Sequence, residues 1–189
     1  GASLGGLASL LAEGALRPGV LAGVILVDVT PRLDEGGVNK ILSFMTEKVE
    51  DGFGSIEEAA DMIASYLPHR KRPKTLDGLS KNLRLREDGR YRWHWGPRFI
   101  TQHAERAHMK DKIQGELLQA AANLKVPSML VRGAASELVK QSHVDEFLEL
   151  VPHAKFTDVK EAGHMVAGDV NDAFTAAIMP FLKEYQAVA

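Results

Sequence analysis

Three short runs of aliphatic and β-branched residues indicate buried strands, at residues 22–29, 127–133 and 155–160. The first two runs are apolar at nearly every position, which is typical of parallel strands covered on both faces. Parallel strands need a crossover connection, usually a helix. The pattern therefore predicts a small parallel sheet with helices packed against it.

Apolar residues at helical spacing occur at residues 4–16 and 141–151 and from residue 171 onward. In the second of these helices, Ser142 and Asp145 have the spacing of a capping box. Pro180 lies inside the third helix and is expected to bend or shorten it, because proline cannot donate a helical hydrogen bond. Strands that alternate with helices in this order predict an α/β fold with a layered sheet.

Residues 34–123 separate the first two strands and have a different character. Three helices are expected in this segment, at residues 38–49, 56–67 and 76–85. Ser55 and Glu58 can cap the second of them as a capping box. Because a crossover needs only about a dozen residues, we expect an inserted helical cap, with the core formed by residues 1–33 and 124–189.

Composition narrows the function classes. The 189-residue chain has a formal net charge of -2, which gives no reason to expect nucleic acid or an anionic membrane as a partner. It has no cysteine, which excludes disulfides and a thiolate nucleophile, and we expect a cytoplasmic protein. No apolar stretch is long enough to span a bilayer. The histidines show no spacing typical of a metal site, so neither a metal nor a cofactor is expected.

The chain opens on GASLG, which matches the G-x-S-x-G pattern of a nucleophile elbow. The backbone of such a strand-to-helix turn is strained, so the residues two before and two after the serine must be small, as Gly1 and Gly5 are. The helix that follows offers free N–H groups and a positive dipole end to an oxyanion. We therefore expect Ser3 to be a nucleophile and the N–H of Leu4 to be an oxyanion donor.

A nucleophilic serine needs a general base, and the base needs an acid that orients it. His164 stands in a glycine-flanked loop after the third strand, and Glu137 follows the C-terminal end of the second. Functional residues gather at that end of parallel strands. Asp28 and Asp34, after the first strand, are alternatives for the acid, although Asp28 is expected rather as a hydrogen-bonding residue at a strand end.

The segments GASLGG, VILVDVTPR, LVRGAASELV and VKEAGHMVAGDVNDAF resemble the C-terminal part of a bacterial α/β-hydrolase. The resemblance is to the branch of cofactor-free haloperoxidase-like esterases and epoxide-hydrolase-like proteins. It implies that Ser3, His164 and Glu137 act as nucleophile, general base and orienting acid in the hydrolysis of small or medium carboxylic esters. Glu137 departs from the commoner aspartate. Serine at the elbow favours ester hydrolysis, while perhydrolysis and C–C bond hydrolysis stay open.

The resemblance also implies a segment ahead of GASLGG, with the strand that leads into Ser3 and a loop that supplies a second oxyanion donor. We therefore expect an internal motif at which the chain has been cut, with weak activity and an unpaired sheet edge that favours self-association. The alternative is a non-catalytic part that complements a missing N-terminal half. Trp93 and Trp95 are expected to line the acyl pocket or to pack within the cap.

Overall fold

The structure is a computed structural model that describes residues 1–68, 70, 75–95 and 107–186. The chain divides into two compact units. The core unit comprises Gly1–Val38 together with Met109–Ala189, and the inserted unit comprises Asn39–His108. The inserted unit is thus shorter at both ends than the segment that the sequence assigned to the cap.

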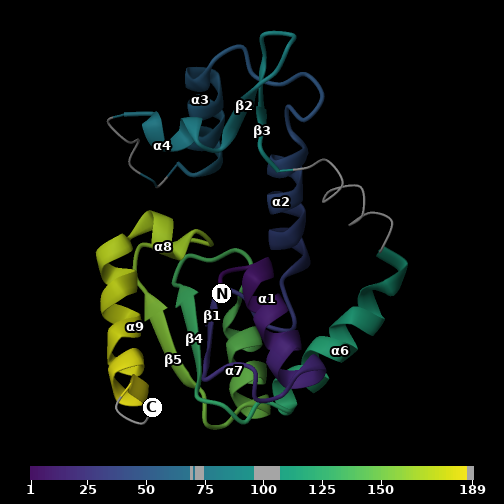
Figure 1. Cartoon of the computed structure of the whole chain (residues 1–189), viewed down its shortest axis with the longest axis vertical. Helices are drawn as coiled ribbons and strands as arrows, with labels where there is room; N and C mark the ends of the chain where they lie inside the picture. The colour runs from purple at the N-terminus through teal and green to yellow at the C-terminus, as the bar shows by residue number, and fades with distance from the viewer. Residues whose placement is uncertain (69, 71–74, 96–106, 187–189) are drawn as a thin grey trace. The chain divides into compact units, whose positions relative to one another are not determined.

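The core unit is built on three parallel strands in the order β1-β4-β5 (Figure 1). They are β1 (Val24–Val27), β4 (Ser128–Gly133) and β5 (Lys155–Val159). The α/β fold class is therefore confirmed. In the register of the sheet Val27 pairs with Val131 and Gly133 with Val159, so the C-terminal ends of the three strands meet at one edge.

Helices cover both faces of this sheet (Figure 1). They are α1 (Leu4–Leu11), α6 (Lys110–Ala122), α7 (Gln141–Leu150), α8 (Val166–Asp169) and α9 (Asn171–Gln186). Val27, Val131 and Val159 pack with Phe181 of α9 on one face. Because side chains alternate across a strand, Leu26 lies on the opposite face, where it is also fully buried.

The structure differs from the sequence prediction at two places in these helices, the shortening at Pro180 and the capping box of α7. Helix α9 runs through Pro180 to Gln186 and is not cut short. Pro180 is exposed, so water can satisfy the carbonyl group that its missing N–H leaves without a donor. At the start of α7, the backbone N–H of Lys140 donates to Nδ1 of His143 at 3.1 Å, so the predicted box of Ser142 and Asp145 does not form there.

Helix α1 continues as a π-helix, η1 (Ala12–Leu16), that carries the buried Glu13. The Glu13 carboxylate accepts the N–H groups of Gly19 and Leu21, at 2.6 and 2.8 Å, and these bonds hold the pKa of Glu13 below its usual value. Next to it, Gly14 touches α6: a Cβ atom on Gly14 would lie 2.0 Å from the carbonyl oxygen of Ala120. Helix α6, which the sequence assigned to the cap, therefore packs against the core.

The outer edge of β1 is paired at its C-terminal end by the first residues of the chain. The N–H of Val27 donates to the carbonyl of Gly1 at 2.9 Å, and the N–H of Ser3 donates to the carbonyl of Val27 at 3.2 Å. Ala2 forms a parallel bridge with Val27. The edge that was expected to be unpaired is therefore covered beside Ser3.

The inserted unit combines helices with a small hairpin. Helix α2 (Glu35–Thr46) leads into it, followed by α3 (Ile56–Tyr66), α4 (Asp77–Ser80), β2 (Leu83–Leu85), β3 (Tyr91–Trp93) and the 3-10 turn η2 (Ala107–Met109). Ser55 caps α3 as predicted, because its Oγ accepts the N–H of Glu58 at 3.1 Å. The predicted third helix is wrong after Ser80, since Leu83 pairs with Trp93 across an antiparallel ladder and both side chains are buried.

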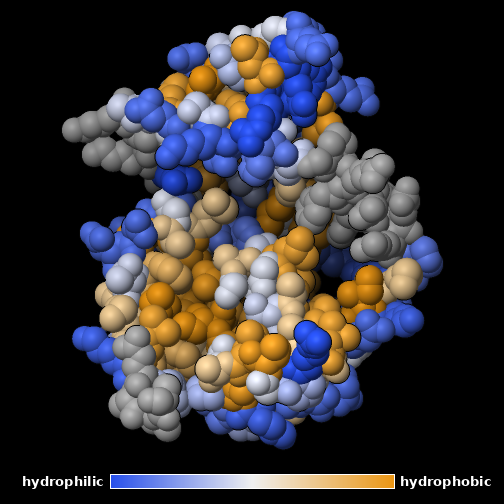
Figure 2. All heavy atoms as spheres, viewed as in Figure 1, coloured by the Kyte–Doolittle hydropathy of each residue, from blue (hydrophilic) through white to orange (hydrophobic). Residues whose placement is uncertain are grey.

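Apolar side chains remain exposed on the core unit. The large ones among the described residues are Leu4, Leu16, Val20, Met165, Met179 and Leu182. Figure 2 shows that apolar side chains gather on the face of this unit that is turned toward the viewer. A contiguous apolar surface of this kind often marks a site of contact with another protein segment.

We predict that Gly14→Ala destabilises the chain by about 1–3 kcal/mol, the usual cost of overpacking, because the added methyl group would collide with the backbone of α6. Gly115→Ala is the matched control. Gly115 also lies within a helix, but nothing lies within 4 Å of an added Cβ atom, so this variant should be more stable by about 1 kcal/mol. Urea denaturation followed by circular dichroism measures the free energy of unfolding of both variants. Equal stabilities of Gly14→Ala and Gly115→Ala would contradict the packing of η1 against α6.

Candidate functional site

The carboxylate of Asp28 and the ring of His164 meet at the C-terminal edge of the sheet. Asp28 directly follows β1 and its exposed fraction is 0%. Nδ1 of His164, in the loop after β5, lies 2.8 Å from Oδ2 of Asp28. Because a carboxylate oxygen accepts hydrogen bonds, Nδ1 is the donor in this contact, and a neutral ring would then have Nε2 as its acceptor. This tautomer is the one that a general base needs.

Asp28 accepts two further hydrogen bonds, one from the last residue of β4 and one from the turn that follows this strand. The N–H of Gly133 donates to Oδ1 at 3.0 Å, and the hydroxyl of Ser136 donates to Oδ2 at 2.7 Å. The backbone N–H of Asp28 itself donates to the carbonyl of Val131 at 2.7 Å. A buried charge is costly unless hydrogen bonds replace its hydration, so these donors are the reason that a carboxylate can occupy this place in the core.

The loop that carries His164 is held close to the end of β4. A Cβ atom on Gly133 would lie 2.1 Å from the carbonyl oxygen of Gly163, so only glycine allows the two segments to approach this closely. On the other side, the N–H of Gly163 donates to Oδ2 of Asp169 in α8 at 3.0 Å. His164 is thereby fixed by neighbours on both sides, and its side chain is 12% exposed.

Ser3 lies at the same strand end, in a strained turn at the start of α1. Its φ of 49° and ψ of -124° are values that side-chain-bearing residues rarely adopt. Its N–H bonds to the carbonyl of Val27, and the next residue after Val27 is Asp28. Within the described residues the Ser3 side chain makes no cap hydrogen bond to α1. The structure therefore brings two of the predicted residues, Ser3 and His164, to one strand end.

The glycines around Ser3 do not all act as the sequence predicted. A Cβ atom on Gly1 would lie 2.5 Å from the backbone of Gly5, so the need for a small residue there is clear. Gly5 itself has open space around its Cβ position among the described residues. The crowded position is Gly6, where a Cβ atom would meet Val29 at 2.5 Å, because the helix crosses the chain after β1 at this point.

Leu4, the expected oxyanion donor, is the first residue of α1. The N–H groups of Gly5, Gly6 and Leu7 donate to the carbonyls of Ala2 and Ser3. The N–H of Leu4 precedes this set at the positive end of the helix, where an anion is favoured. Its side chain is 58% exposed, so the side chain itself does not close off the turn from solvent.

The two other candidate acids lie elsewhere. Glu137 is half buried in the turn between β4 and α7, and its backbone carbonyl lies against Gly37. Oδ1 of Asp34 accepts the N–H of Gly37 at 2.9 Å, at the start of α2. The carboxylate at His164 belongs to Asp28, not to the expected Glu137. The sequence analysis did not single out Ser136, whose hydroxyl donates to Asp28. The signal in the sequence was its position next to Glu137 in the same turn.

Trp93 and Trp95 lie in the hydrophobic cluster of the inserted unit. Their rings stack with centroids 4.5 Å apart, and Phe53 packs edge-on against Trp93. Neither indole N–H has a hydrogen-bond partner within the described residues. The placement agrees with cap packing, which was the second of the two expectations for this pair.

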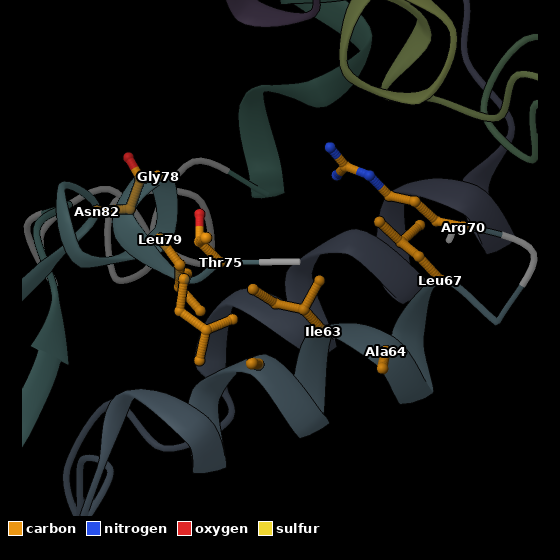
Figure 3. Close-up of a pocket in the computed structure, with 10 residues that line it drawn as sticks. Ile63, Ala64, Leu67, Arg70, Thr75, Gly78, Leu79 and Asn82 are labelled. Atoms are coloured by element: carbon orange, nitrogen blue, oxygen red, sulfur yellow. The ribbon is translucent and has the colours of Figure 1, made fainter. Parts of the chain in front are cut away.

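A cavity of about 390 Å³ lies within the inserted unit (Figure 3). Ile63 of α3, Leu67 just after this helix and Leu79 of α4 give the cavity an apolar wall. Arg70 and Asn82 add polar groups. The two tryptophans are not among its lining residues. The cavity adjoins the tryptophan cluster, because Ile63 and Leu79 both line the cavity and pack against that cluster.

In the described part of the chain, no cluster of three or more histidine, aspartate or glutamate residues is arranged to hold a metal ion. No described helix is long and apolar enough to cross a membrane.

Comparison of the sequence with family models and with curated proteins finds little similarity. No family model matches the chain. A segment of 62 residues is 31% identical to part of the polyketide synthase ThaQ of Burkholderia thailandensis, and it covers 33% of this chain and 3% of that protein. A match of this extent shows no family membership for the whole chain.

Solved structures match nearly the whole chain. The crystal structure of E-2-(acetamidomethylene)succinate hydrolase has a TM-score of 0.76 at 22% identity, and the match covers 97% of this chain and 65% of that one. An esterase from Mycobacterium tuberculosis gives 0.71 at 24% identity, with 97% and 59% covered. An α/β-hydrolase from Novosphingobium aromaticivorans gives 0.71 at 22% identity, with 97% and 64% covered. The chain thus spans less than two thirds of each of these three proteins, and over that span it has the fold of an α/β-hydrolase.

Proposed function

We propose that Ser3, His164 and Asp28 form the catalytic triad of a serine hydrolase that acts on small or medium carboxylic esters. The observation that carries the proposal is the 2.8 Å contact between Nδ1 of His164 and the fully buried carboxylate of Asp28, at the strand end where Ser3 is bonded. In this proposal Asp28 takes the role that the sequence assigned to Glu137. The hydrolase and esterase among the structural neighbours support the reaction class.

Each group has one task in the proposed reaction. Oγ of Ser3 attacks the ester carbonyl carbon while Nε2 of His164 takes the hydroxyl proton, and the N–H of Leu4 binds the resulting oxyanion. His164 then gives the proton to the leaving alkoxide, the alcohol departs and the acyl group stays on Ser3. Water then attacks the acyl group while His164 takes one of its protons. When His164 returns this proton to Oγ of Ser3, the carboxylic acid is released. Asp28 stays ionised and stabilises the imidazolium form of His164.

We also propose that the chain acts as part of a longer hydrolase and that alone it is a weak catalyst or a non-catalytic partner. Three observations support this. The chain spans 65% and 59% of two neighbours. Among the described residues the proposed site has one oxyanion donor, the N–H of Leu4, whereas such a site usually has two. The core unit leaves large apolar side chains such as Leu182 exposed.

A fluorophosphonate probe tests the nucleophile. We predict a slow, single adduct on the wild-type chain, detected by intact mass spectrometry, that disappears in Ser3→Ala. Ser9→Ala is the matched control and should keep the adduct, because the Ser9 hydroxyl lies in the same helix and donates to the carbonyl of Gly5. An adduct that persists in Ser3→Ala would contradict the assignment, and an unlabelled wild-type chain would favour the non-catalytic alternative.

The choice of acid has its own test. We predict that Asp28→Asn lowers the rate of probe labelling by about 10³- to 10⁴-fold, because the imidazole loses the partner that sets its tautomer and stabilises its charge. Glu137→Gln should label at close to the wild-type rate. The labelling time course, followed by mass spectrometry for the two variants side by side, measures this. A larger loss in Glu137→Gln than in Asp28→Asn would reverse the assignment.

A further inference from the structure

The hydroxyl of Ser136 has all of its hydrogen-bonding capacity in use. Its Oγ atom accepts the N–H groups of Leu138 and Val139, at 3.0 and 3.1 Å. A hydroxyl has one proton and two lone pairs. Because the two N–H groups occupy the lone pairs, the proton is left for Oδ2 of Asp28, 2.7 Å away. The direction of this hydrogen bond therefore follows from the network around it.

Oδ2 of Asp28 receives two donors, the hydroxyl of Ser136 and Nδ1 of His164. Oδ1 is held at the same time by the N–H of Gly133. The carboxylate cannot rotate without breaking at least one of these bonds in a fully buried place, where an unpaired group is costly. The orientation of Asp28 toward the ring therefore depends on the turn after β4 as much as on His164.

We propose that Ser136 is a positioning residue, whose hydroxyl holds Oδ2 of Asp28 against Nδ1 of His164. Its catalytic consequence rests on the proposed hydrolase function, whereas the geometric claim concerns only these three side chains. When the hydroxyl is removed, Oδ2 loses a donor and the N–H groups of Leu138 and Val139 lose their acceptor. The turn after β4 and the Asp28 carboxylate can then adopt conformations that the wild-type hydrogen bonds prevent. The His164 ring no longer has a partner in a fixed position.

The geometric claim is tested by proton NMR of the full chain labelled with ¹⁵N-histidine. A ring N–H bonded to a buried carboxylate gives a downfield resonance, and its absence in His164→Gln identifies the resonance of His164. In Ser136→Ala we expect this resonance to move or to be lost through exchange with water, and in Ser136→Thr, which keeps the hydroxyl, to stay. An unchanged resonance in Ser136→Ala overturns the proposal.

The matched control is Ser128→Ala. Ser128 is a buried residue on the neighbouring strand β4, but its hydroxyl donates to the backbone carbonyl of Val126 at 2.9 Å. Removal of the Ser128 hydroxyl should leave the His164 resonance in place. If Ser128→Ala changes this resonance as much as Ser136→Ala does, the effect is a general loss of packing and the proposal is overturned. If Ser136→Ala does not fold, Ser136→Cys keeps the volume and replaces a strong donor by a weak one. An unchanged resonance in Ser136→Cys counts against the proposal in the same way.

Reactivity separates this inference from the proposed function. Ser136→Ala should lower kcat or the rate of probe labelling about tenfold, the effect of one charge-assisted hydrogen bond, with KM unchanged. Ser136→Thr should recover most of the rate. A changed resonance on a chain whose Ser3 never reacts supports the role of Ser136 while the hydrolase proposal fails. An unchanged resonance on a chain with reactive Ser3 overturns the role of Ser136 and leaves the hydrolase proposal standing.

Discussion

The burial of one carboxylate, that of Asp28, organises the C-terminal edge of the sheet. With an exposed fraction of 0%, this group needs hydrogen bonds to replace its hydration. They come from the N–H of Gly133, the hydroxyl of Ser136 and the ring of His164. Three segments that are far apart in the sequence must therefore converge, and this convergence places the ring at the strand end to which Ser3 is bonded.

Local strain accompanies this arrangement. Ser3 and Asp28 both have a φ of 49°, and Glu161, at the start of the loop that carries His164, has a φ of 61°. Side-chain-bearing residues hold such values only where surrounding structure maintains them, and functional sites are where they gather. Here the bonds from Ser3 to β1 and from Asp28 to β4 provide that support. The close approach of Gly133 to Gly163 gives the histidine loop its fixed place.

Much of the fold could be predicted from the sequence, because β4 is buried on both faces and its central residues, 129–131, are all apolar. The carboxylate that contacts His164 could not be predicted in this way, because both Asp28 and Glu137 follow strands. The contact of Asp28 with the ring depends on the backbone turn at Asp28, where φ is 49°. The hairpin was mistaken for a helix for a related reason. Leu76, Leu79 and Leu83 repeat at helical spacing, but Leu83 is placed by its pairing with the distant Trp93.

The most direct measurement of the central claim is a crystal structure of the chain after reaction with a fluorophosphonate. The account predicts phosphorus bonded to Oγ of Ser3, a phosphonyl oxygen at the N–H of Leu4, and Nδ1 of His164 bonded to Asp28. Phosphorus on another residue, or a His164 ring turned to Glu137, would contradict it.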